Sequence, residues 1–167
     1  MKMQLIQPFI SAADCVLATA LDGPATIGDL TMDEQDYRPR GYAARISIHG
    51  DIEGRIVVDM APETALRVAS ALSGQQVEAA DETVHETVHE LANMMIGNAV
   101  TLLNDHGYQF KVLPPEQHTS DAPVQNKSDV EELAIFFDTS YGRIFLSVRM
   151  RYNLRERAQR LTAPSLA

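Results

Sequence analysis

Residues 42–60 read YAARISIHGDIEGRIVVDM, two runs rich in Ile and Val on either side of a turn that ends at Gly54. Because β-branched residues favour strands and glycines favour tight connections, this stretch predicts a β-hairpin. A second stretch of the same kind, ELAIFFDTSYGRIFLSVRMRY, occupies residues 132–152 and turns before Gly142. We therefore expect a largely antiparallel sheet built around two hairpins.

Three other segments have the apolar periodicity of helices. Residues 8–23 and 62–74 each begin with a proline, repeat apolar residues at helical spacing and stop at a glycine. Residues 81–107 predict the longest helix. Its expected buried stripe consists of Val84, Val88, Leu91, Met95, Ala99 and Leu102, widened by Ala92, Ile96 and Leu103.

The two halves of the chain have the same layout of helix, glycine, strand and hairpin. EGRIVV in the first hairpin matches YGRIFL in the second, which indicates an internal duplication. The expected fold class is α/β (α+β): one domain, with a largely antiparallel sheet, long helices on one face and a pseudo-twofold relation between the halves.

Aligning Gly23 with Gly107 extends this duplication to the helices. It places Ile6 and Phe9 at the positions of Glu90 and Asn93. On this alignment, only the second half carries a polar pair.

Composition restricts the compartment and the partners. A chain of 167 residues with 45% hydrophobic residues suits one core, and we assign residues 1–153 to a domain and 154–167 to a mobile or loosely helical tail. A net charge of -9 argues against nucleic acid and anionic membranes and favours a basic partner surface. The single Cys15, expected on the buried side of its helix, and the absence of a membrane-length apolar run predict a cytoplasmic protein.

The longest predicted helix also carries a polar stripe. Glu86, Glu90, Asn93 and Gly97 follow steps of four, three and four residues, roughly opposite the apolar stripe. Surface glutamates are common, but Asn and Gly are unfavourable inside a helix. We interpret the stripe as a surface that contacts another molecule.

These residues resemble a known family. The E-x-x-N motif of Glu90 to Asn93, followed by Gly97, is similar to the active-site helix of the CheC, CheX and FliY family of chemotaxis phosphatases. The resemblance extends over PFI, HGDIEGRIVVDM, PETALRVASALSG, ELANMMIGNA and FFDTSYGRIFLSV. A single E-x-x-N helix resembles the CheX type more than the two-site CheC type.

The resemblance implies that the chain hydrolyses the phospho-aspartate of a CheY-like response regulator. Asn93 would orient the attacking water, and Glu90 would pair with a lysine of the receiver. Glu86, Gly97 and Pro115 would contact the receiver. The resemblance further implies no metal or cofactor on this chain, Mg²⁺ in the partner receiver, and a homodimer.

One alternative keeps the fold without the catalysis. The family commonly has Asp or Ser at the position of Glu86, and the downstream proline, here Pro115, falls slightly off register. A non-catalytic domain that binds a receiver or acts as a scaffold would accommodate both departures.

Another alternative is a zinc hydrolase. His85-Glu86-Thr87-Val88-His89 fits the H-E-x-x-H pattern, which can present two zinc ligands and a general base on a helix. The extended pattern fails, because Ala92 and Met95 stand where it needs a glycine and a third histidine. Without a third ligand, this alternative ranks below the phosphatase.

Overall fold

The structure is a computed structural model that describes residues 4–21, 23, 26–31, 41–78, 82–119 and 129–162. Its helices are α1 (Gln7–Ala20), α2 (Pro62–Ser73), α3 (Glu82–Asp105) and α4 (Leu154–Thr162). Its strands are β1 (Thr26–Thr31), β2 (Tyr42–Gly50), β3 (Ile52–Met60), β4 (Phe110–Val112), β5 (Glu116–Gln117), β6 (Val130–Thr139) and β7 (Gly142–Tyr152). None of these helices is both long and apolar enough to cross a membrane.

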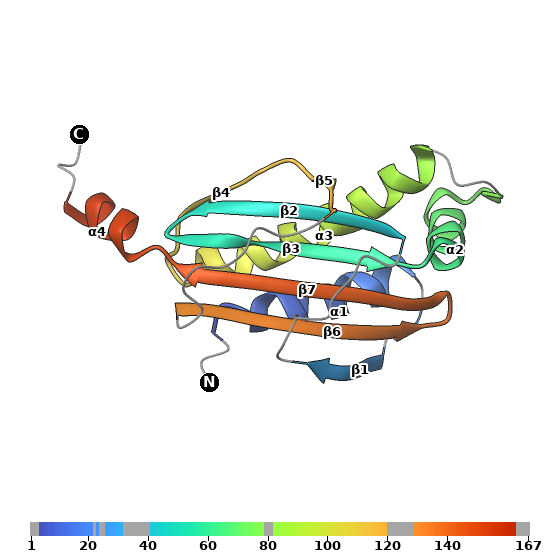
Figure 1. Cartoon of the computed structure of the whole chain (residues 1–167), viewed down its shortest axis with the longest axis horizontal. Coiled ribbons are helices and arrows are strands. Elements are labelled where there is room, and N and C mark those ends of the chain that lie inside the picture. Colours follow the sequence, from blue (N-terminus) through green and yellow to red (C-terminus); the bar gives the residue numbers. More distant parts are fainter. Residues whose placement is uncertain are drawn as a thin grey trace.

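All strands belong to one antiparallel sheet with the order β1-β6-β7-β3-β2-β4, and β5 also pairs with β2 (Figure 1). Both predicted hairpins are present as β2–β3 and β6–β7, and they join through β3 and β7. The strand that follows each long helix lies beside the hairpin of the other half, β1 beside β6 and β4 beside β2. This arrangement confirms the predicted fold class.

Exchanging the two halves replaces β1 with β4, β6 with β2 and β7 with β3. The strand order is then the same, read from the opposite edge of the sheet. Gly54 in β3 and Gly142 in β7 are the matching glycines of the repeated sequence. Val58 and Leu146 lie the same number of residues beyond these glycines, and they are direct partners between β3 and β7. A pseudo-twofold axis therefore passes through the Val58 and Leu146 pair.

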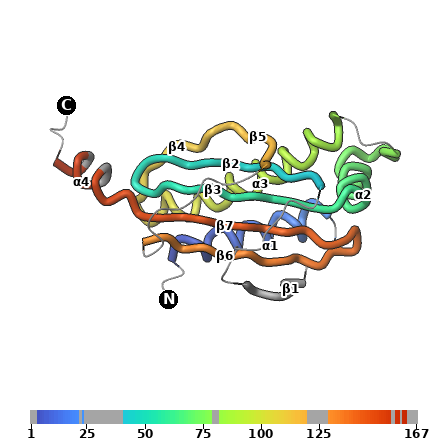
Figure 2. The backbone as a smooth tube through the Cα atoms, in the orientation of Figure 1, coloured from blue at the N-terminus to red at the C-terminus, as the bar shows by residue number. Residues whose placement is uncertain are grey.

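The core lies between the sheet and two helices. Figures 1 and 2 show α1 and α3 behind the same face of the sheet, with α2 beyond one end and α4 beyond the other. Alternate strand residues such as Ile46, Ile56 and Val148 point to this face and are fully buried. Each large apolar side chain buried in this way contributes about 1.5–3 kcal/mol of transfer free energy. The sheet thereby fixes which face of α3 points outward.

Ion pairs join neighbouring strands on the opposite face of the sheet. The pairs are Arg45–Glu116 at 2.5 Å, Arg149–Glu132 at 2.5 Å, and Arg151–Glu53. Partly exposed pairs of this kind contribute little individually. Because these charges find partners within the chain, this face is a weak candidate for binding a charged molecule.

Two details of the predicted burial were wrong. Leu102 is 39% exposed, because Leu103 takes the core position in the last turns of α3. Cys15 is exposed, because the inward arc of α1 is filled by Ala12, Ala13 and Val16. Neither error changes the assignment of helices.

Candidate functional site

The polar stripe of α3 faces away from the core. Glu86, Glu90, Asn93 and Gly97 are all exposed. The buried residues on the other side are Val84, Val88, Leu91, Ala92, Met95, Ile96, Ala99 and Leu103. A helix with 3.6 residues per turn separates these sets onto opposite faces, as the sequence predicted.

Gly97 lies in the helical interior of α3 without a structural need for glycine. A Cβ atom added there would meet nothing within 4 Å, and Gly97 is not among the glycines with positive φ. Glycine in a helix costs about 1 kcal/mol relative to alanine. The described surroundings of Gly97 therefore give no packing reason for a glycine at this position.

The buried residues of α1 and α3 show which positions of the two helices correspond. Six buried residues in and just before α1 match six of α3 at one constant spacing: Leu5 with Leu91, Ile6 with Ala92, Phe9 with Met95, Ile10 with Ile96, Ala13 with Ala99, and Leu17 with Leu103. The predicted equivalence of Ile6 and Phe9 with Glu90 and Asn93 was therefore wrong. The Gly23–Gly107 alignment would instead pair the buried Ile6 and Phe9 with the exposed Glu90 and Asn93.

The same spacing identifies the residues of the first half that do match the polar stripe. Gln4 corresponds to Glu90, Gln7 to Asn93 and Ser11 to Gly97, and all three first-half residues are exposed. Gln7 Nε2 donates to Ser11 Oγ at 3.4 Å. The first half thus has a neutral polar stripe, and the Glu–Asn pair occurs only on α3.

The two histidines of α3 lie beside the stripe. The ring of His85 contacts the ring of Tyr42 with centroids 4.5 Å apart, so His85 packs against the first residue of β2. Burial and, secondarily, the nearby His85 lower the pKa of His89 below 6.5. The buried His89 Nε2 has no hydrogen-bond partner among the described residues.

These histidines have few of the features of a metal centre. Within the described ranges, no three His, Cys, Asp or Glu side chains converge as a ligand set. The ring of His85 packs edge-on against Tyr42, and His89 Nε2 is buried. The arrangement supports a packing role for the pair.

Pro115 is half-buried and lies between β4 and β5. Next to it, Glu116 pairs with Arg45 of β2, the strand on which α3 packs. Pro115 therefore lies at the sheet edge that flanks α3. Its predicted contact with a partner stays a prediction.

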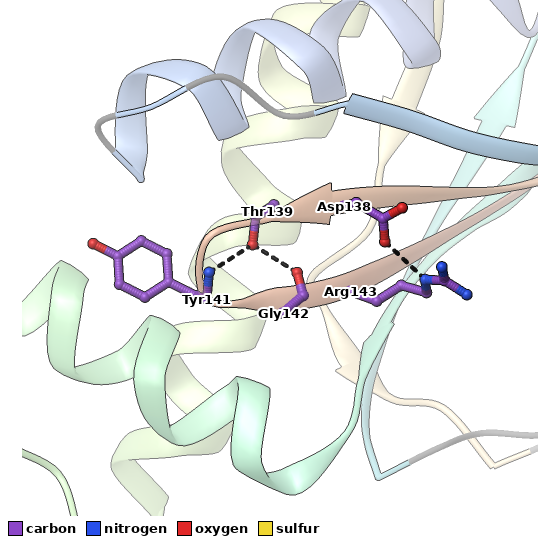
Figure 3. A network of polar contacts seen from close by, with 5 residues as sticks. All are labelled: Asp138, Thr139, Tyr141, Gly142 and Arg143. Atoms are coloured by element: carbon purple, nitrogen blue, oxygen red, sulfur yellow. Dashed lines mark hydrogen bonds and ion pairs between the residues drawn. The ribbon is translucent and has the colours of Figure 1, made fainter.

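A second polar cluster lies at the tip of the β6–β7 hairpin (Figure 3). The Thr139 hydroxyl donates to the Gly142 carbonyl at 2.6 Å and accepts the Tyr141 N–H at 3.2 Å. Asp138 pairs with Arg143 at 2.8 Å across the two strands. These contacts close the turn, so we assign the cluster a structural role.

Sequence reasoning overlooked one residue of the α3 surface, Met94. It is 37% exposed, although it is a large apolar residue next to Asn93. Its position four residues after Glu90 was a signal that the sequence already contained, because such residues are neighbours on a helix.

The fold and the site together consist of a seven-stranded antiparallel sheet that supports one exposed E-x-x-N helix. The family model described as chemotaxis phosphatase CheX matches residues 42–138, which include β2 to β5, all of α3, and most of β6. The chain belongs to the CheX family.

Known relatives agree with this assignment. A Thermotoga maritima protein described as CheY-P phosphatase CheX is 33% identical over 78 residues, which cover 46% of this chain and 50% of that protein. The match thus spans about half the length of that relative.

Solved structures extend the similarity to most of the chain. The CheX structure in a CheX–CheY–BeF3–Mg²⁺ complex from Borrelia burgdorferi is 29% identical, with a TM-score of 0.72, and the match covers 90% of this chain and 99% of that one. A CheC-like superfamily protein from Shewanella sp. PV-4 has a TM-score of 0.76 at 24% identity, with the same coverage. The latter similarity concerns the fold alone.

Proposed function

We propose that this chain hydrolyses the phospho-aspartate of a CheY-like receiver, with Asn93 as the water-positioning residue and Glu90 as the docking carboxylate. The observation that carries the proposal is the joint exposure of Glu90, Asn93 and Gly97 on one face of α3. The description of the Thermotoga relative as a CheY-P phosphatase supports the substrate. The Borrelia complex of CheX with CheY supports the kind of partner.

The proposed chemistry is positional. The Asn93 amide can both donate and accept hydrogen bonds, so it can hold a water in line with the acyl phosphate. The Glu90 carboxylate can pair with a lysine ammonium and orient the two proteins. Charge on the transferring phosphoryl group would be neutralised by Mg²⁺ bound in the receiver, so the chemistry assigned to this chain requires only these side chains.

Glu86 and Gly97 complete the proposed contact surface. Glu86 lies one turn before Glu90 and adds negative charge that attracts a basic partner surface. Gly97 lies one turn after Asn93 and leaves room for the partner backbone. Pro115, on the flanking sheet edge, would contact the rim of the receiver.

We also infer that two copies of the chain pair, as the resemblance to the CheX type implies. Static light scattering on the purified protein tests this inference. A mass corresponding to two chains supports it, and a mass corresponding to one chain over the working concentration range contradicts it.

The central experiment measures loss of phosphate from a phosphorylated CheY-like receiver of the same organism, with and without this protein. We expect wild type to accelerate the loss and Asn93→Ala to abolish the acceleration while still binding the receiver. Binding by wild type without acceleration would favour the non-catalytic, receiver-binding alternative. Equal rates with wild type and Asn93→Ala would disprove the water-positioning role.

A further inference from the structure

Met94 is an apolar side chain on the otherwise polar surface of α3. It is 37% exposed and belongs neither to the buried core cluster nor to the partly buried hydrophobic residues that pack against it. The other exposed large hydrophobic residues in the described part of the chain are Leu102, Val112, Leu113, Leu154 and Leu161. Met94 alone among these six is adjacent to the Glu–Asn pair.

Helical geometry places Met94 within the proposed contact surface. It follows Glu90 by four residues, follows Asn93 directly and precedes Gly97 by three. Residues three or four apart on a helix have Cβ atoms about 5–6 Å apart. A protein that binds Glu90 and passes close to Gly97 must therefore cover Met94.

The fold does not require methionine at this position. Glutamine has a helix propensity close to that of methionine and would be better solvated on an exposed face. Methionine is instead enriched at protein interfaces, where its flexible thioether adapts to an apolar surface. The choice of Met94 is thus better explained by a partner than by the core.

We propose that Met94 is the apolar anchor of this docking surface and determines which receivers fit it. The matching receiver would present an apolar patch about one helical turn from the cation that meets Glu90. This inference rests on the proposed function. Because Met94 would contact the receiver beside the phosphoryl group and not at it, its contact should stabilise the ground-state complex and the transition state equally, and so affect KM and not kcat.

The test compares Met94→Gln with wild type in phosphoreceiver decay at varied receiver concentration. Losing this apolar contact should raise KM about five- to tenfold and leave kcat within about twofold. Leu102→Gln is the matched control, because Leu102 is similarly exposed on α3 but lines a hollow of about 380 Å³ beside α1. This variant should have the wild-type KM. Met94→Leu should retain most of the wild-type KM.

An unchanged KM in Met94→Gln, or a fall in kcat as large as the rise in KM, would overturn the proposal. If Met94→Gln has lost the circular dichroism of the folded protein, Met94→Ala replaces it under the same criteria. Calorimetric binding of a beryllofluoride-loaded receiver separates this proposal from the proposed function. Even if wild type did not accelerate phosphate loss, Met94→Gln should weaken this binding about five- to tenfold, and equal binding would overturn the anchor role.

Discussion

Helices α1 and α3 occupy equivalent places in the two halves, yet they present different surfaces. Six buried residues in and just before α1 match six of α3 at one spacing, from Leu5 with Leu91 to Leu17 with Leu103. Their exposed stripes differ, because α1 has Gln7 where α3 has Asn93. Packing against a shared core restrains the inner face of a helix, whereas the outer face is free to change. The duplication therefore preserved the scaffold, and the Glu–Asn pair occurs on one of the two helices.

The largest expected effect compares the matching glycines of the two hairpins. A Cβ at Gly54 would lie 2.0 Å from the backbone oxygen of Arg149, whereas at Gly142 it would lie 2.3 Å from the side-chain oxygen of Thr64. Both residues have positive φ, but a side chain can rotate away and the central strand cannot. We expect Gly54→Ala to lower the free energy of unfolding by about 3–5 kcal/mol and Gly142→Ala by about 1–2 kcal/mol.

Urea denaturation of both variants checks this prediction. Equal losses of stability would show that the two hairpins are constrained alike despite their different neighbours. A loss confined to Gly142→Ala would contradict the closer backbone contact that the structure shows at Gly54.

The second prediction concerns catalysis and compares the two helices directly. Asn93→Ala should slow the decay of the phosphoreceiver about 100-fold, equivalent to about 2.7 kcal/mol in the activation barrier, because the water loses its orienting amide. Gln7→Ala, the same truncation at the matching position of α1, should leave the rate within about twofold. Single-turnover decay at saturating enzyme measures both rates.

An effect of Gln7→Ala as large as that of Asn93→Ala would show that the first half also acts on the receiver. Helix α1 would then contact the receiver as well as pack against the core. Circular dichroism of both variants verifies that the rates refer to folded protein.

The sequence was sufficient for the two hairpins and for the outward face of α3. β-branched runs around glycines predicted β2–β3 and β6–β7, and a strong helical period predicted the exposure of Glu90 and Asn93. Both signals are local, so they survive without knowledge of the tertiary structure. The proposed boundary between the domain and its tail at residue 153 stays a prediction.

Features that depend on contacts distant in sequence could not be predicted. Strand β5 has only two residues and exists because it pairs with Ala44 and Arg45 of β2. The correspondence of α1 with α3 was misjudged because Gly23 and Gly107 lie outside the helices, in connections that need not have equal length. Burial of Phe9 against the core reveals the correct register, and burial is a tertiary property.

A smaller effect is expected at Gly97 and its counterpart Ser11. Gly97→Ala should raise the free energy of unfolding by about 0.5–1 kcal/mol, because alanine favours the helix and its Cβ meets no neighbour. The same change should raise KM for the phosphoreceiver several-fold, since the added methyl group obstructs close approach. Ser11→Ala should change stability slightly and KM not at all.

Thermal unfolding and steady-state decay assays measure these two effects separately. A stabilised Gly97→Ala protein with an unchanged KM would disprove the close-approach role and leave Gly97 without a function. Loss of stability would instead contradict the open surroundings of this residue.

The last and smallest predicted effect concerns the protonation of a histidine. Helix α3 contains His85 and His89, whereas α1 contains no histidine. The lowered pKa of His89 means that the unfolded chain binds a proton more readily than the folded one. The contribution of neutral His89 to stability is therefore fully present above about pH 6.5 and is lost as the pH falls through the folded-state pKa.

His89→Gln removes this proton linkage, so wild type should lose more stability than the variant between pH 7 and pH 5. Urea denaturation across that range measures the difference, and parallel stability profiles would mean that the enclosed imidazole does not titrate with folding.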